Sequence, residues 1–283
     1  DSHGRGYPRP QLRRNSWTSL NGPWEFAIDR DAIWRSPDDV QWDTTILVPF
    51  APESSASGIG DTGFMRACWY RRSVPVPEVS NGARVILHFG AVDYEATVWV
   101  AGQRIGCHEG GYTPFCFDIS EWAGRSVDVV VRADDDPHDL AKPRGKQDWQ
   151  LVPHSIWYPR TTGIWQTVWL EVVPRTALES VRWTPTIERW EIGLESWLSG
   201  ARQSGLRLQV KLTIDGQLIA DDTYSVLCGE THRRIALSDP GIDDYRNELL
   251  WSPESPTLIS ASLHLWGSDD TPLDSVTCYT ALR

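Results

Sequence analysis

Residues 84–102 read RVILHFGAVDYEATVWVAG, and this stretch decides the fold class of the chain. Within it, Arg84–Phe89 and Glu95–Val100 both carry apolar side chains at alternating positions. The alternating residues are Val85, Leu87, Phe89, Ala96, Val98 and Val100. Alternation places side chains on one face of a strand, and β-branched and aromatic residues favour strands. The stretch therefore predicts two strands, each with one buried face.

Short apolar runs of the same kind recur on both sides of this stretch. They cover residues 24–28, 42–49, 68–77, 103–107, 115–119, 127–132, 164–173, 177–182, 207–214 and 217–220. A spacing of about 8–12 residues with Gly, Pro, Asn and Asp between the runs is typical of β-sandwiches and jelly rolls. A helical turn is expected only at Ile242–Leu250, where Pro253 ends it. We therefore expect an all-β protein.

The length and the strand pattern indicate two domains. A chain of 283 residues corresponds to two domains at about 150 residues each, and a new set of strands begins after Pro174. We expect the domains to cover residues 1–174 and 175–283. Asp1–Arg14 is polar and rich in Pro and Gly, so we expect an arm lying on the surface.

The charge balance argues against two classes of partner. Lys and Arg number 27 and Asp and Glu 38, which gives a net charge of −11 without a basic face. We therefore expect neither a nucleic-acid nor a membrane partner. Because the chain begins at Asp1 and not at Met, we expect a processed N-terminus. A cleaved signal peptide would leave no trace, so a cytoplasmic and an exported bacterial-type enzyme both stay open.

The cysteines and a run of aspartates raise the question of a metal. The five cysteines are irregularly spaced without a CxxC pair, so zinc is not expected. Free thiols are the default, and a Cys107–Cys116 disulfide stays an alternative. Asp134–Asp136, with His138 and Asp139, could offer oxygen ligands to Ca²⁺, but the spacing of a calcium loop is absent. We expect no metal and no cofactor.

Charged and aromatic residues are concentrated in Lys142–Glu171, which reads KPRGKQDWQLVPHSIWYPRTTGIWQTVWLE. Prolines and glycine make its first two thirds a loop, and its last third has strand composition. Aromatic faces beside charged and amide groups suit a sugar ring. The candidate substrate-binding residues are Arg144, Gln147, Asp148, Trp149, Trp157 and Arg160. The alternative is a loop whose tryptophans fill core and whose polar groups make surface hydrogen bonds.

Several motifs resemble one enzyme family. They are WYRR at 69–72, HFGAVDYEATVWVAGQRIGCHEGGYTPFCFDIS at 88–120, GIWQTVWLE at 163–171 and LNGPWEF at 20–26. In this order they resemble the N-terminal sugar-binding domain of family 2 glycoside hydrolases, which include β-galactosidases, β-glucuronidases and β-mannosidases. LWSPESPTL at 250–258 and CYTALR at 278–283 resemble the second domain of that family, although Ile259 and Ala281 depart from its pattern.

The resemblance implies a fold and a role. The fold would be a jelly-roll galactose-binding-like sandwich followed by an immunoglobulin-like β-sandwich. In the family, a (β/α)₈ barrel with two catalytic glutamates hydrolyses terminal β-glycosides by a retaining mechanism. The alternating strand–helix pattern of a barrel is absent here. We therefore expect a non-catalytic N-terminal region that helps to shape the sugar pocket of its own barrel. A free-standing carbohydrate-binding protein, a structural scaffold and a homo-oligomer stay open.

Catalytic residues are not expected within the chain. Retaining hydrolysis needs two carboxyl groups about 5.5 Å apart. The acidic residues considered by type are Glu53, Glu95, Glu109, Asp118 and Asp148, and none has a supporting motif. The resemblance also implies a sugar-contacting carboxylate about six residues before Gly163, but that position holds Trp157. The nearest carboxylate is Asp148, so the identity of the sugar does not transfer.

Overall fold

The structure, a computed structural model, describes residues 6–201, 203–237 and 249–283. Regular structure in these ranges is β-strand, apart from short 3-10 turns. The turns are η1 (Pro37–Asp39), η2 (Ser55–Ser57), η3 (Ser120–Trp122) and η4 (Ile187–Arg189). The expected all-β class is confirmed. Residues 242–248 of the expected helical turn lie outside the described residues.

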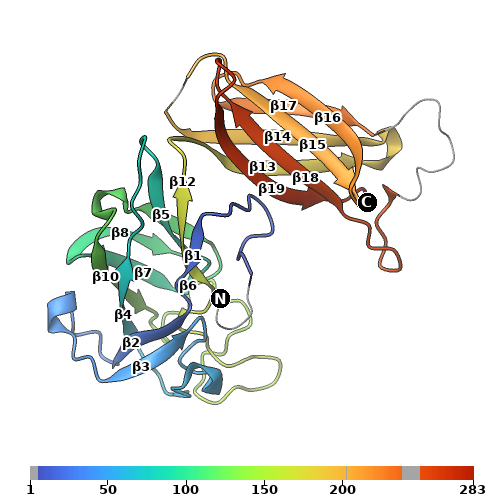
Figure 1. Ribbon diagram of the computed structural model, residues 1–283. Helices are drawn as coiled ribbons and strands as arrows, with labels where there is room; N and C mark the ends of the chain where they lie inside the picture. The colour runs from blue at the N-terminus through green and yellow to red at the C-terminus, as the bar shows by residue number, and fades with distance from the viewer. Residues whose placement is uncertain (1–5, 202, 238–248) are drawn as a thin grey trace. The chain divides into compact units, whose positions relative to one another are not determined.

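Contacts between residues divide the chain into two units. The first comprises mainly Trp17–Ser80 and Arg84–Val172. The second comprises Arg9–Ser16, Asn81–Ala83 and Val173–Arg283. Figure 1 shows strands β1–β12, coloured blue to yellow, in the first unit and β13–β19, coloured yellow to red, in the second.

Antiparallel sheets build the first unit. Its strands are β1 (Trp17–Ser19), β2 (Gly22–Asp29), β3 (Thr44–Val48), β4 (Ala67–Pro75), β5 (Arg84–Phe89), β6 (Val92–Asp93), β7 (Glu95–Val100), β8 (Gln103–Glu109), β9 (Phe115–Asp118), β10 (Ser126–Asp134), β11 (Gly163–Ile164) and β12 (Val168–Val173). One sheet has the order β1-β12-β5-β9, another β3-β2-β4-β10-β7-β8, and β11 pairs with β6.

The apolar faces of these strands meet in one core. Both larger sheets contribute fully buried side chains, including Phe26, Tyr70, Leu87, Val98 and Leu170. The strands β5 and β7 do not pair with each other, although they are close in sequence. β5 pairs with β9, and β7 pairs with β10 and β8. The segment between them changes sheets, so their apolar faces enter the core from different sheets.

The second unit contains β13 (Thr176–Thr186), β14 (Glu191–Gly200), β15 (Arg207–Ile214), β16 (Gln217–Ser225), β17 (Glu230–Ala236), β18 (Ile259–Trp266) and β19 (Pro272–Thr280). They form one sheet of order β13-β14-β17 and one of order β16-β15-β18-β19. Both sheets contribute side chains to a second core. Alternating burial along β14 and β15 gives each sheet an inner and an outer face.

The segment Arg9–Ser16 is part of this second unit, so the expectation of a surface arm is wrong for these residues. Leu12 is buried in the core, and the backbone of Arg13 pairs with Thr277 of β19. The Arg14 guanidinium, which is also buried, donates two hydrogen bonds to Asp274 and one to the carbonyl of Leu178. The buried side chains of Leu12 and Arg14 thus anchor the segment.

Two further expectations concern cysteines and metals. The five cysteines all lie in the described part of the chain and form no disulfide bond, so the Cys107–Cys116 alternative is wrong. The Asp134–Asp136 carboxylates form ion pairs with Arg66, Arg132 and Lys142. Among the described residues, no cluster of three or more His, Cys, Asp or Glu side chains is placed to hold a metal ion.

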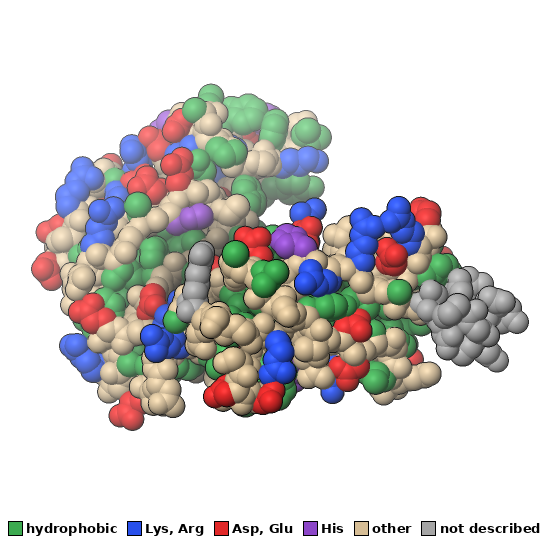
Figure 2. All heavy atoms as spheres, turned by 90° about the horizontal axis from the view of Figure 1, so that it is seen from above, with side chains coloured by type: hydrophobic (Ala, Val, Ile, Leu, Met, Phe, Trp, Pro, Cys, Tyr) green, Lys and Arg blue, Asp and Glu red, His purple; other side chains and the backbone are tan. Residues whose placement is uncertain are grey.

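The surface carries charges of both signs. Figure 2 shows Lys and Arg side chains interspersed with Asp and Glu side chains over the face in view. The net charge of −11 is therefore not gathered into one acidic patch on that face. Within the described ranges, no helix has the length and apolar character that crossing a membrane requires.

Candidate functional site

The candidate site is a long connection between β10 and β11, which we call the site loop (residues 135–162). Its central part is closed by backbone hydrogen bonds: the Asp148 N–H donates to Tyr158 O over 2.8 Å, and the Tyr158 N–H donates to Lys146 O over 2.9 Å. Gly145 has a φ of +60°, a conformation that favours glycine, and starts this closure. The loop is therefore folded on itself.

Asp148 lies at the centre of the closed segment and is fully buried. Its carboxylate accepts hydrogen bonds from the Gln150 N–H (2.9 Å), the His154 N–H (2.7 Å) and the His154 ring Nδ1 (2.7 Å). Burial raises the pKa of the Asp148 carboxyl, but these hydrogen bonds outweigh it, and the pKa lies below its usual value. Asp148 thus acts as an internal cap that fixes the turn to His154.

Gln147 ties the loop to strand β6 and to the connection between β8 and β9. Its Nε2 donates to Asp93 Oδ2 over 2.7 Å and to the Tyr112 hydroxyl over 3.0 Å. Its Oε1 accepts a hydrogen bond from the Thr161 N–H over 2.7 Å. Burial raises the pKa of Asp93 to about 7, although the Gln147 hydrogen bond opposes that rise. A Cβ on Gly111 would lie 2.3 Å from Asp93 Oδ1, so only glycine fits there.

The two arginines bind backbone carbonyls. Arg160 is buried, and its guanidinium donates to the carbonyls of Gln150, Thr62 and Gly63. Burial lowers the pKa of Arg160. The Nη atoms of Arg144 donate to the carbonyls of Pro137 (3.4 Å) and Asp139 (2.5 Å). Both side chains therefore hold the path of the loop.

Although Gln147, Asp148 and Arg160 are buried, several apolar side chains of the site loop are exposed. We call these residues the apolar loop surface: Leu140 (69% exposed), Trp149 (39%), Leu151 (51%), Val152 (73%), Ile156 (64%) and Tyr158 (62%). Trp149 packs edge to face on Trp157, with ring centroids 5.0 Å apart. A recess of about 290 Å³ opens beside them, lined by Leu140, Arg144, Gly145, Gln147, Trp149 and Trp157.

The predicted residues therefore lie together but in different settings. Arg144, Gln147, Trp149 and Trp157 line the recess, whereas Asp148 and Arg160 lie buried within the loop. The alternative of core tryptophans is wrong, because Trp149 is exposed and Trp157 is half-buried. The alternative of surface hydrogen bonds is correct about the bonds and wrong about the place: Asp148 and Arg160 both form hydrogen bonds within the protein, but both are buried.

Sequence reasoning missed two residues that fix this site. Asp93 and Tyr112 both contact Gln147 from distant parts of the chain. Asp93 ends a short apolar run and Tyr112 follows two glycines, and neither pattern signals a contact with residue 147. The burial of the Asp93 carboxyl would have indicated a contact, but only the tertiary structure reveals that burial.

The acidic residues considered for catalysis are scattered. Glu53 accepts two hydrogen bonds from Thr162, and burial raises the pKa of its carboxyl. Glu95 and Glu109 face each other in the β7–β8 register, and both are exposed. Asp118 accepts hydrogen bonds from Ser120. Glu53 and the loop residue Asp148 both accept hydrogen bonds from groups of the site loop, and these bonds occupy both carboxylates.

Comparison with known proteins adds a family relationship. Residues 61–135 match the family described as glycosyl hydrolases family 2, sugar binding domain. A β-galactosidase of Thermoanaerobacter pseudethanolicus is 28% identical over 226 residues, covering 76% of this chain and 28% of that protein. A β-glucuronidase of Felis catus is 34% identical over 131 residues, covering 42% of this chain and 20% of that protein. The matched parts thus cover less than a third of the length of either relative.

Solved structures share the fold. A Bifidobacterium dentium β-glucuronidase, solved in complex with coumarin-3-O-glucuronide, superimposes with a TM-score of 0.72 at 18% identity. The match covers 98% of this chain and 49% of that chain. At this identity the likeness concerns the fold alone, and it extends over both units.

Proposed function

Because residues 61–135 carry the sugar binding domain of family 2 glycosyl hydrolases, we propose that the chain is the non-catalytic N-terminal region of such an enzyme. The parent enzyme hydrolyses terminal β-glycosides, such as β-galactosides, by a retaining mechanism in a (β/α)₈ barrel. The names of the relatives, β-galactosidase and β-glucuronidase, support this reaction class. In this proposal the site loop helps to shape the sugar pocket of the barrel.

The finer description of the fold belongs to the same proposal. We assign residues 1–174 to a jelly-roll galactose-binding-like domain and residues 175–283 to an immunoglobulin-like domain. The two larger sheets of the first unit support the jelly roll, and the sheets of three and four strands in the second unit support the immunoglobulin-like sandwich. Arg9–Ser16 then lies within the sequence range of the first domain but packs in the second unit.

The observation that carries the functional proposal is the apolar loop surface. Large apolar side chains that stay exposed together mark interaction sites, and tryptophan and tyrosine are enriched among residues that dominate binding energy. Hydrogen bonds inside the protein occupy the Gln147, Asp148 and Arg160 side chains, so the surface offers contact area more than hydrogen bonds. Such a surface fits a docked catalytic barrel, with Trp149 and Trp157 bordering its sugar pocket.

The first test is hydrolysis by the chain itself. The purified 283-residue chain should release no nitrophenol from nitrophenyl β-galactoside, β-glucuronide or β-mannoside above a buffer blank, because its acidic residues do not form a pair in the recess. A longer form that includes the barrel should hydrolyse one of them. Turnover by the chain alone that disappears in Glu53→Gln or Asp148→Asn would overturn the proposal.

The second test separates a docking role of the tryptophans from a packing role. Trp149→Ala should change the free energy of unfolding by less than about 1 kcal/mol, since exposed side chains contribute little. Trp157→Ala should cost more than that, because Trp157 is half-buried, but less than a core tryptophan. The control Trp24→Ala, at a side chain 1% exposed, should cost about 3–5 kcal/mol. In the parent enzyme, the two loop variants should lower kcat/KM without a matching loss of melting temperature. A large fall in melting temperature for Trp149→Ala would contradict the docking role.

A free-standing carbohydrate-binding protein is the second candidate function. The exposed ring of Trp149 beside a recess favours it, because apolar sugar faces stack on such rings. Titration with methyl β-galactoside and methyl β-glucuronide, followed by tryptophan fluorescence, distinguishes the two. Saturable binding by the isolated chain that is lost in Trp149→Ala supports this candidate over a surface that waits for a barrel.

A further inference from the structure

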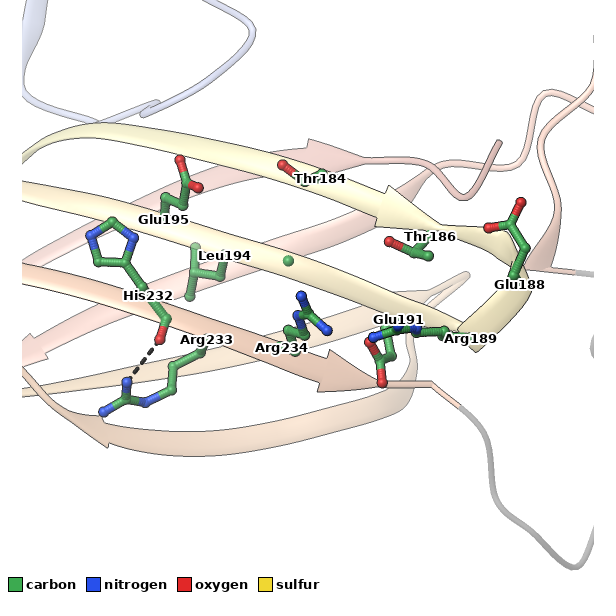
Figure 3. Close-up of a pocket in the computed structure, with 11 residues that line it drawn as sticks. Thr184, Thr186, Glu188, Arg189, Glu191, Leu194, Glu195, His232, Arg233 and Arg234 are labelled. Carbon is green, nitrogen blue, oxygen red and sulfur yellow. Dashed lines mark hydrogen bonds between the residues drawn. The ribbon is translucent and has the colours of Figure 1, made fainter.

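The second unit carries a hollow that the proposed function does not use. It lies on the outer face of the β13-β14-β17 sheet, has a volume of about 780 Å³ and falls in the usual range of ligand sites. Its lining residues are Thr184, Thr186, Glu188, Arg189, Glu191, Gly193, Leu194, Glu195, His232, Arg233 and Arg234. We call it the sheet hollow. In Figure 3, Thr184 and Thr186 lie on the strand at one side and His232 and Arg234 on the strand at the other.

A glycine in the middle strand creates the depth of the hollow. Gly193 pairs with Thr184 of β13 on one side and with Arg234 of β17 on the other. Because β14 buries Ile192 and Leu194, the outward position between them has no side chain at all. A Cβ on Gly193 would lie 3.1 Å from the Thr184 carbonyl oxygen, so even a methyl group would crowd this floor.

Several of the polar groups around this floor are unoccupied, whereas Glu195 pairs with Arg182 and His232 with Glu230. Among the described residues, the side chains of Thr184, Thr186, Arg189, Glu191 and Arg234 have no hydrogen-bond or ion-pair partner. This contrasts with the site loop, where internal hydrogen bonds take up the polar groups. The sheet hollow therefore has the free donors and acceptors that the site loop lacks.

The charges of the lining restrict the ligand. Arg189 and Arg234 lie beside the carboxylates of Glu188, Glu191 and Glu195, so the lining carries both signs. Glu195 also pairs with Arg182, and the Arg233 guanidinium lies over Tyr224. A polyanion would meet the carboxylates and a polycation the guanidinium groups. A sugar hydroxyl both donates and accepts, so a neutral polyhydroxylated ligand matches both kinds of group.

An aromatic ring lies at one end of the same face. Trp197 follows Gly193 and Glu195 in the outward positions of β14 and packs edge to face on His232, with ring centroids 5.8 Å apart. Tryptophan beside hydroxyl and charged groups suits the apolar face and polar edge of a sugar ring. A second copy of the chain fits less well, because two hollows placed face to face would leave a gap.

We propose that the sheet hollow binds a neutral oligosaccharide chain across β13, β14 and β17. Gly193 gives room for a sugar ring, while Thr184, Glu195 and Arg234 bind its hydroxyl groups. Trp197 stacks on the next ring along the chain. The second unit would then be a carbohydrate-binding module in its own right.

The test is calorimetric titration of the 283-residue chain with cellohexaose, xylohexaose, mannohexaose and laminarihexaose at millimolar concentration. One or more should bind, and tetragalacturonate should bind no more tightly. Gly193→Val fills the floor and Arg234→Ala removes an unpaired donor, and each should weaken binding by about tenfold or more. Lys211→Ala, on the outer face of the other sheet, is the matched control and should bind like the unmodified chain.

Several outcomes would overturn the proposal. They are the absence of binding to all four hexaoses, binding that Arg234→Ala leaves unchanged, and tighter binding of tetragalacturonate than of any hexaose. Binding lost in Trp149→Ala but kept in Arg234→Ala would place the sugar on the site loop instead. Arg234→Ala decides the matter if Gly193→Val fails to fold, because the Arg234 side chain is exposed and unpaired.

Discussion

Gly163→Ala should destabilise the first unit by about 2–6 kcal/mol, the sum of backbone strain and overpacking. Gly163 has a φ of +75°, and a Cβ there would lie 2.1 Å from the Tyr70 hydroxyl and 3.0 Å from Cys68 Sγ. Both side chains are fully buried, so neither can move aside. The change also falls where the site loop enters β11. Urea denaturation followed by tryptophan fluorescence measures the loss.

A matched control separates strain from crowding. Gly102 has a similar φ of +80° but no atom within 4 Å of a Cβ, so Gly102→Ala should cost only about 1–2 kcal/mol. Adding Tyr70→Phe to Gly163→Ala removes the nearest atom and should restore part of the stability. Equal losses for Gly163→Ala and Gly102→Ala would show that crowding against Tyr70 is absent.

Arg14→Ala should destabilise the second unit by about 3–5 kcal/mol, because it leaves a buried carboxylate without its cation. The side chains of Arg14 and Asp274 are only 6% and 2% exposed, and their closest atoms are 2.7 Å apart. Asp274 also accepts a hydrogen bond from the Leu178 N–H, so the pair links the N-terminal segment, β13 and β19. Thermal and urea unfolding of the variant measure the loss.

Two further variants make this expectation specific. Arg207→Ala removes an arginine that pairs with the exposed Asp270, and this change should cost about 0–1 kcal/mol. Arg14→Met with Asp274→Asn removes both charges and should be more stable than Arg14→Ala alone. If Arg14→Ala were no more harmful than Arg207→Ala, the Arg14–Asp274 pair would not be an anchor.

Sequence patterns predict strands more reliably than they predict strand neighbours. The alternation in β5 and β7 gave each a buried face, but β5 pairs with β9 and β7 with β10. Alternation sets which side chains share a face, whereas pairing depends on how the connections cross between sheets. The family motifs added the order of the elements, and the matching sugar binding domain at 61–135 confirms that part of the resemblance.

The site loop shows where residue types stop being informative. Its tryptophans, arginines and Asp148 were predicted as one cluster, and they do lie in one loop. Their composition could not reveal that the Asp148 carboxylate bonds to Gln150 and His154, because that depends on the path of the backbone. The same holds for Arg14. From the sequence we expect it in a surface arm, whereas the structure buries it against Asp274.

The placement of Arg9–Ser16 has a consequence for the order of synthesis. On the ribosome this segment is made before the strands of the first unit, yet its backbone partner Thr277 is made only after all of those strands. The first unit has all of its strands long before that, while Leu12 must wait for β19 to complete the core that covers it. A gene fusion or truncation that keeps only the residues after Pro174 would therefore lack Arg9–Ser16, a segment of the second unit.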